Sequence, residues 1–153
     1  GGVHFIPYLE PGHYLGLDKE KDLIEAGIEQ ELGQQVVDQQ QPQFVVSSTF
    51  EFEEFGVQPD FALAQSLFTH LPAPMIVECL RKLRVVAKPA TRFYATFFES
   101  KKRVSNPAQP HDHIGFWFTR NEMAEFGKQA GWEMRYIGDW KHPRQQMLVC
   151  YHL

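Results

Sequence analysis

The feature that most constrains the fold of this chain is an alternation between short apolar runs and longer segments whose apolar residues recur every three or four positions. The short runs are too brief for helices and predict strands, whereas the periodic segments predict amphipathic helices. This alternation predicts an α/β fold in which helices cover a largely parallel sheet. The expected strands lie at 13–17, 44–46, 60–66, 92–98, 132–137 and 146–151, and the expected helices at 19–32, 72–89 and 119–131.

Residue types at the segment ends support these assignments. Pro72 and Pro74 open the second helix and Pro89 closes it, while Thr119 and Glu122 have the spacing of a capping box at the start of the third. The run 60–66 predicts a strand buried on both faces, and the glutamine-rich segment 34–43 predicts a loop. Residues 50–55 fit either a strand edge or an irregular segment. The last two strands predict an antiparallel pair that closes the sheet.

Length and composition exclude several classes of protein. A chain of 153 residues is expected to form a single domain, 1–153, with a core that needs no metal or disulfide. The net charge of −4 provides no general attraction to nucleic acid or anionic membranes, and no apolar run reaches the roughly 18 residues of a membrane span. Of the two cysteines, Cys79 falls among the apolar residues of an expected helix, so we predict free thiols and a cytoplasmic protein.

Polar residues after two of the expected strands are candidates for ligand binding, because sheets of this kind bind ligands beyond the carboxyl ends of their strands. Asp18 follows the first strand, where a carboxylate can accept hydrogen bonds from two ribose hydroxyls; capping of the following helix is the alternative. Gln65 and Ser66 end the third strand, and His70 comes shortly after. His70 is a candidate base, with a hydrogen-bonded structural histidine as the alternative. No metal site is predicted, because the triplet 111–113 is typical of a solvated loop.

Four stretches, taken in order, resemble the class I S-adenosylmethionine-dependent methyltransferases. They are GGVHFIPYLEPGHYLGLDKEKDLIEAG, DFALAQSLFTHLP, CLRKLRVVAKP and RFYATFFE. In that family a strand ending in an acid leads into a helix, a later strand ends near the sulfonium, and a helix then leads through a turn into the next strand. The resemblance covers nearly the whole chain. It implies a Rossmann-like, doubly wound, mostly parallel sheet with an antiparallel C-terminal strand, and S-adenosylmethionine as cofactor.

The resemblance also implies roles for individual residues. Asp18 would bind the ribose hydroxyls with Lys19 beside it, and the segment after the second strand would neighbour the adenine. The end of the third strand would lie along the methionine portion and the methyl group, and His70 would face the acceptor as the candidate catalytic residue. The implied cofactor-binding residues are Gly1, Gly2, Asp18, Lys19, Phe50, Glu51, Gln65, Ser66 and Phe68.

The family's first strand and most of its glycine-rich loop have no counterpart after Gly1, so the resemblance implies a domain truncated at its N-terminus, with Gly1 and Gly2 as the end of that loop. That strand normally lies between the strands that end at Asp18 and Ser66, so we expect the centre of the sheet to be disturbed. We also expect the 153-residue chain alone to bind the cofactor weakly or not at all.

The function implied by the resemblance is transfer of a methyl group to an acceptor, which we predict to be a small molecule. Two alternatives stay open at the level of sequence. One is a non-catalytic binding or scaffold domain that keeps the fold, and the other is a nicotinamide-dependent oxidoreductase, which would not normally end in an antiparallel pair of strands. No nucleic-acid or membrane partner is predicted, and a homodimer is left open.

Overall fold

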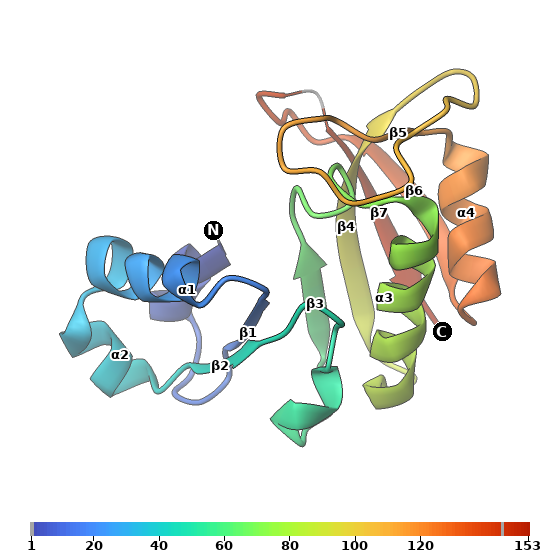
Figure 1. Ribbon diagram of the computed structural model, residues 1–153. Coiled ribbons are helices and arrows are strands. Elements are labelled where there is room, and N and C mark those ends of the chain that lie inside the picture. The colour runs from blue at the N-terminus through green and yellow to red at the C-terminus, as the bar shows by residue number, and fades with distance from the viewer. Residues whose placement is uncertain (1, 145) are drawn as a thin grey trace. The chain divides into compact units, whose positions relative to one another are not determined.

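The structure is a computed structural model that describes residues 2–144 and 146–153 (Figure 1). The chain divides into two compact units, which we call the N-terminal unit, Gly1–Val57, and the C-terminal unit, Gln58–Leu153. The expectation that all 153 residues form one domain stays a prediction.

The N-terminal unit holds a sheet of two parallel strands, β1 and β2, with short helical segments before, between and after them. Asp18 at the end of β1 pairs in register with Val46 at the end of β2, so both strands finish at the same level. The elements are η1 Gly2–Tyr8, β1 Leu15–Asp18, α1 Lys21–Gly27, η2 Ile28–Leu32, α2 Gln34–Gln40, β2 Gln43–Val46 and η3 Phe52–Phe55.

Two expectations for this unit need correction. The segment 34–43 is not a loop, because α2 occupies most of it; glutamine is a good helix former, and Gln34 donates a hydrogen bond to the Asp38 carboxylate one turn on at 2.7 Å. The expected helix 19–32 is divided into α1 and the π-helical η2. Gly33 ends it as predicted, with φ of 77°, a conformation that glycine adopts without steric cost.

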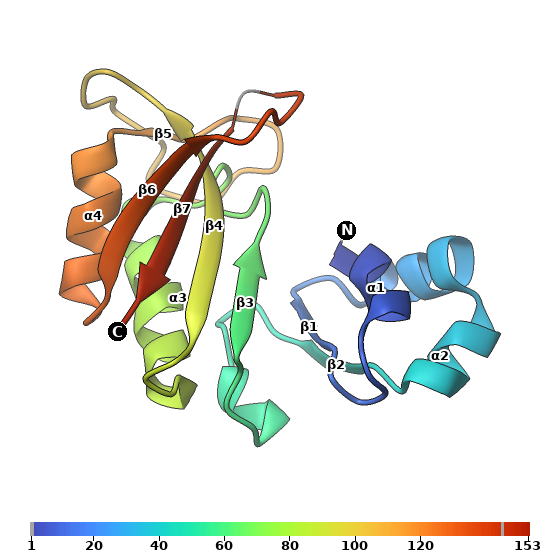
Figure 2. The same ribbon diagram turned by 180° about the vertical axis from the view of Figure 1, so that it is seen from behind.

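The C-terminal unit is a five-stranded mixed sheet, shown from behind in Figure 2. Its strand order is β3-β4-β7-β6, and β5 pairs with the end of β4. Strands β3 and β5 run parallel to β4, whereas β7 runs antiparallel to both β4 and β6, which confirms the predicted closing pair. The elements are β3 Phe61–Ala64, α3 Ala73–Val86, β4 Arg92–Glu99, β5 Trp117–Phe118, α4 Arg120–Gln129, β6 Glu133–Asp139 and β7 Met147–His152.

The core of this unit lies between the sheet and the two helices α3 and α4, which cover the same face (Figures 1 and 2). Tyr151 of β7 is fully buried there, and its hydroxyl donates to the Met123 carbonyl of α4 at 2.9 Å. Position 127 on α4 requires glycine, because a Cβ would lie 2.7 Å from the Tyr151 ring. The predicted capping box of α4 is confirmed, with Thr119 and Glu122 each accepting the other's backbone N–H.

The strand at 60–66 is shorter than expected and is not buried on both faces. Phe61 and Leu63, which share one face of β3, are 72% and 47% exposed. The strand ending at Asp18 pairs with β2 and the strand before Ser66 pairs with β4, so these two strands do not pair with each other, and the expected disturbance between them stays a prediction. Within the described residues, no helix is long and apolar enough to cross a membrane.

Candidate functional site

Asp18 stands at the carboxyl end of β1, as the strand-end argument requires. Its Oδ1 accepts a hydrogen bond from the Glu20 backbone N–H at 3.0 Å, which turns the chain toward α1. The N-cap position of α1 itself is Glu20, so Asp18 caps the backbone ahead of the helix rather than its first turn. The second oxygen of the half-buried Asp18 carboxylate has no hydrogen-bond partner within residues 2–144 and 146–153, so it is open to a ligand hydroxyl.

The other predicted residues of the N-terminal unit have structural contacts of their own. Lys19 is exposed and forms an ion pair with Glu20 at 3.8 Å. Glu51 accepts hydrogen bonds from the hydroxyls of Ser47 and Thr49, which tie together the loop after β2. The loop therefore holds the Glu51 carboxylate near the end of β2. Of the two N-terminal glycines, Gly2 begins η1 and Gly1 lies outside the described residues.

Phe50 belongs to the same loop but faces inward. Its side chain is 6% exposed and stacks on Phe52, with ring centroids 6.3 Å apart. Its backbone has φ of 61°, in the left-handed region that non-glycine residues rarely adopt. Phe50 is therefore a packing residue of the N-terminal unit, and little of its side chain is left for the expected adenine contact.

Ser66 directly follows β3 and is held by a small polar network. Its backbone N–H donates to Thr96 Oγ1 at 2.8 Å, and its Oγ accepts from Gln146 Nε2 at 3.0 Å. Thr96 Oγ1 in turn donates to Gln146 Oε1 at 2.6 Å. Gln146 is only 1% exposed, so the network ties the end of β3 to β4 and to the residue just before β7 in a buried setting. Its neighbour Gln65 is exposed.

Phe68 and His70 follow in the same loop, with different surroundings. Phe68 is fully buried and packs edge-on against Phe93, with centroids 5.9 Å apart, so its side chain serves the core of the C-terminal unit. His70 is half-buried, and its Nδ1 lies 3.2 Å from the His111 carbonyl oxygen. A carbonyl only accepts, so Nδ1 carries the proton and Nε2 of the neutral ring is left as a proton acceptor.

The histidines of the triplet 111–113 serve the loop itself. His111 Nδ1 accepts the backbone N–H groups of His113 at 3.0 Å and Ile114 at 3.2 Å. Across residues 2–144 and 146–153, no group of three or more histidine, cysteine or acidic side chains is placed to hold a metal ion.

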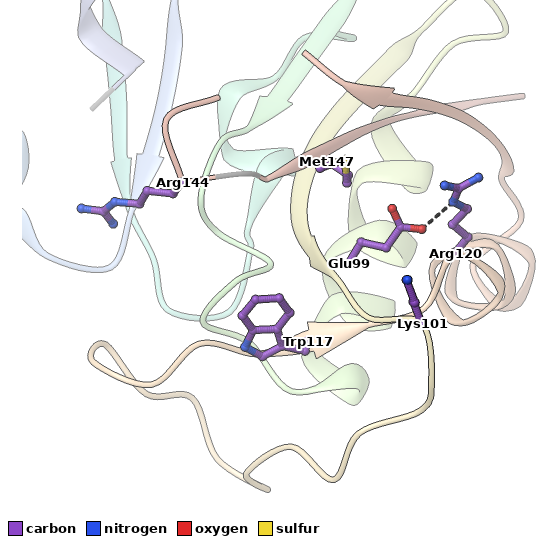
Figure 3. Close-up of a pocket in the computed structure, with 6 residues that line it drawn as sticks. All are labelled: Glu99, Lys101, Trp117, Arg120, Arg144 and Met147. Atoms are coloured by element: carbon purple, nitrogen blue, oxygen red, sulfur yellow. Dashed lines mark hydrogen bonds and ion pairs between the residues drawn. The ribbon is translucent and has the colours of Figure 1, made fainter. Parts of the chain in front are cut away.

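A pocket of about 290 Å³ opens at the carboxyl end of β4 and was not foreseen (Figure 3). Glu99, the last residue of β4, accepts hydrogen bonds from Arg120 Nε at the start of α4 and from the Tyr136 hydroxyl on β6, the latter at 2.6 Å. The Arg120 guanidinium also lies 3.7 Å above the Tyr136 ring. The residues that line the pocket are Glu99, Lys101, Trp117, Arg120, Arg144 and Met147.

These contacts determine the charge state of Glu99. Partial burial alone would raise the pKa of its carboxyl, but the hydrogen bonds from Arg120 and Tyr136 outweigh that effect and hold the pKa below its ordinary value. Glu99 is therefore a carboxylate with its lone pairs engaged, rather than a free base. Its place directly at a strand end is the signal that could have identified it, since the same rule singled out Asp18 and Ser66.

Solved structures share this fold across nearly the whole chain. A protein of Nostoc punctiforme, named provisionally as an O-methyltransferase, gives a TM-score of 0.70 at 17% identity, over 91% of this chain and 44% of its own. Mitomycin 7-O-methyltransferase gives 0.67 at 15% identity, over 99% of this chain and 44% of its own. Human N-acetylserotonin methyltransferase in complex with S-adenosylmethionine gives a TM-score of 0.64 at 12% identity, over 98% of this chain and 42% of its own.

The fold is that of the class I methyltransferases. This confirms the fold class that the sequence predicted. The chain spans less than half the length of these three proteins. Comparison with protein-family models and with curated proteins gives no match.

Proposed function

We propose that this chain belongs to an S-adenosylmethionine-dependent methyltransferase that acts on a small molecule. The observation that carries the proposal is the methyltransferase fold itself, matched over 91% or more of the chain by O-methyltransferases and by an enzyme solved with S-adenosylmethionine. The polar strand ends support it, because they offer the kinds of group that such a cofactor needs.

The residues of the chain fit parts of this cofactor. Asp18 has one carboxylate oxygen without a partner among the described residues, which suits a ribose hydroxyl. Glu51 and Lys19 lie near the ends of the same two parallel strands, where we place the adenosine. The assignment of Gln65 and Ser66, in the C-terminal unit, to the methionine portion stays a prediction of the family resemblance.

When bound, S-adenosylmethionine supplies an electrophilic methyl group: an acceptor lone pair forms the new bond to carbon, sulfur keeps the electrons of the broken bond, and the acceptor hydroxyl loses its proton. The protein's part is to orient the acceptor and exclude water. We assign the departing proton to His70 Nε2, because Nδ1 is engaged with the His111 carbonyl.

The test is a titration of S-adenosylmethionine and, separately, NAD, followed by calorimetry and thermal shift. The titration uses the 153-residue chain. We expect it to bind S-adenosylmethionine weakly but in preference to NAD, and to methylate a small acceptor at high cofactor concentration. Preference for NAD, or binding without any transfer across a panel of hydroxylated acceptors, would reject the proposal.

Asp18→Asn tests the ribose assignment within the same titration. It keeps the shape and the bond to Glu20 but removes the charge, so cofactor binding should weaken by roughly 1.5 to 3 kcal/mol. Asp22→Asn is the matched control, because it removes one exposed charge from the first turn of α1. Equal affinity of the Asp18 variant and the parent would remove Asp18 from the site.

A further inference from the structure

The side chains that line the pocket at the end of β4 indicate what kind of ligand it binds. We propose that it binds the methyl acceptor, and that the acceptor is a small aromatic compound bearing a carboxylate. This inference rests on the proposed function, since it identifies the pocket as the acceptor site. Charge, aromatic surface and size each support it.

Cations outnumber acids in the lining, with Lys101, Arg120 and Arg144 against Glu99. Glu99 is already engaged by Arg120 and Tyr136, so it does not neutralise a second cation. Lys101 forms no ion pair with any of the described residues, and Figure 3 shows its ammonium directed toward the Glu99–Arg120 pair. Arg144 extends away from the others in this view, so Lys101 and the outer nitrogens of Arg120 are the cations that would meet a carboxylate. An entering carboxylate would gain a partner there without displacing one.

The same pocket also has an aromatic surface, which Trp117 provides. Trp117 is 45% exposed although it is a large apolar side chain in a strand. It stacks on Phe98, with ring centroids 4.9 Å apart and planes inclined by 23°, which holds the indole in one orientation. The side chain of Met147 adds a polarisable apolar contact to the lining. A planar ring in the pocket would bury the exposed part of the indole.

Size and long-range charge limit the ligand further. The volume of about 290 Å³ is at the small end of ligand pockets, which are roughly 300–1,000 Å³, so a compound of one or two rings fits. Residues 58–153 carry 13 lysines and arginines and 8 acids, a net charge of +5, whereas residues 1–57 carry 2 lysines and 11 acids, a net charge of −9. Taken by itself, the unit that contains the pocket therefore has a net positive charge that favours an anionic ligand.

The test measures binding of 4-hydroxybenzoate to the 153-residue chain by calorimetry at low salt, without cofactor. The neutral probe 4-hydroxybenzamide has nearly the same shape. We expect the acid to bind at least about threefold more tightly than the amide, because an exposed charge pair is worth a factor of roughly 2 to 5. The difference should shrink when the salt concentration is raised to about 0.5 M.

Three variants separate the contributions. Lys101→Glu should weaken binding of the acid by roughly 3- to 10-fold and leave the amide within about twofold, since attraction becomes repulsion. Lys102→Glu makes the same charge change at the adjacent exposed residue outside the lining and should alter neither. Trp117→Leu should weaken acid and amide alike, by roughly 2- to 10-fold, because the lost ring contact is uncharged.

The outcomes are decisive in both directions. Equal binding of acid and amide, equal effects of Lys101→Glu and Lys102→Glu, or no binding of the acid by the parent would overturn the inference. Circular dichroism checks each fold, and Lys101→Gln, which removes the charge without reversing it, replaces Lys101→Glu if that variant does not fold. Because the cofactor is absent, failure here leaves the S-adenosylmethionine titration unaffected. A chain that discriminates at Lys101 but never binds the cofactor counts against the proposed function alone.

Discussion

At the scale of single residues, the loops after β2 and β3 contain backbone strain at the positions that the sequence singled out. Phe50 and Ser66 have φ of 61° and 58°, although neither is glycine. Such conformations cost roughly 1 kcal/mol or more and persist only where the surroundings hold them. At Ser66 the holding groups are the side chains of Thr96 and Gln146, far away in the sequence. Residues outside the predicted site also adopt this conformation, so the strain at Ser66 reflects its long-range hydrogen bonds and does not by itself assign a ligand role.

Two substitutions at Ser66 separate its strain from its hydrogen bond. Ser66→Ala and Ser66→Gly both remove the hydroxyl and leave the buried Gln146 amide short of a partner, which should destabilise the protein by roughly 1–3 kcal/mol. Glycine relieves the left-handed backbone, so Ser66→Gly should be more stable than Ser66→Ala by about 1 kcal/mol. Urea denaturation measures both. If the alanine variant equals or exceeds the glycine variant in stability, the backbone at this position is not strained.

The second prediction at this scale is that part of the folding stability depends on pH through Glu99. Its folded-state pKa is lowered, so its contribution to the free energy of unfolding is present above the unfolded pKa of about 4.3 and is lost as pH falls through the folded value. The stability difference between the parent and Glu99→Gln should therefore be largest near neutral pH and shrink below about pH 4.

Chemical denaturation between about pH 3 and pH 7 checks this expectation. Glu133→Gln is the control, because it also removes one glutamate, at an exposed position of β6. A Glu99 variant whose stability deficit stayed constant across the range would show that the ion pair with Arg120 contributes nothing that depends on pH.

At the scale of elements, the presence or absence of a side-chain cap explains which helices match their predicted bounds. The α4 helix starts where its capping box lies, with Thr119 Oγ1 accepting the Glu122 N–H at 3.2 Å and the Glu122 carboxylate accepting the Thr119 N–H at 2.9 Å. In contrast, α1 has no side-chain cap, and it gives way to a π-helical turn after seven residues. A local cap therefore made one helix predictable, and its absence left the other poorly defined.

Removing the cap of α4 tests this account. Thr119→Ala should lower the free energy of unfolding by about 1 kcal/mol, because it leaves helix N–H groups without their acceptor. Thr119→Ser keeps the hydroxyl and should stay within about 0.5 kcal/mol of the parent. Thermal unfolding of the three proteins side by side measures the effect. Equal losses in the two variants would mean that the threonine methyl, and not the cap, stabilises the helix.

At the scale of the whole molecule, the two units differ in how much core they hold. Among the described residues, three buried apolar side chains lie in the N-terminal unit, namely Val3, Ile6 and Phe50. The α1, η2 and α2 segments have no buried residue. The C-terminal unit contains the remaining buried apolar residues, packed between five strands and two helices.

This difference predicts which part folds by itself. Residues 58–153 alone should give a cooperative thermal transition and a dispersed amide spectrum, because their core is complete within the unit. Residues 1–57 alone should give neither, since a chain of that size is marginal even with a full core. A dispersed spectrum from residues 1–57, or an unfolded one from residues 58–153, would contradict this expectation.

Most elements, and the positions of Asp18 and Ser66 at strand ends, were predictable because their signals are local. The helix α3 lies between Pro72 and Pro89, β4 and β7 are rich in apolar and aromatic residues, and Asp18 stands at the end of its strand. Each of these depends on period, end residues or adjacency, which a sequence displays without knowledge of the fold. The helix α2 was missed for the matching reason, because its polar sequence has no apolar period.

The sequence by itself thus determined the α/β class, the antiparallel closure and the positions of Asp18 and Ser66 at strand ends. Only the tertiary structure decided that Phe61 is exposed and that Phe68 is in the core. It also decided the pocket, in which Glu99 meets Arg120 and Tyr136 from 21 and 37 positions along the chain. The reason is that burial and long-range contacts depend on which strands pair and in what register. The spacing of apolar residues within one segment contains no information about that pairing.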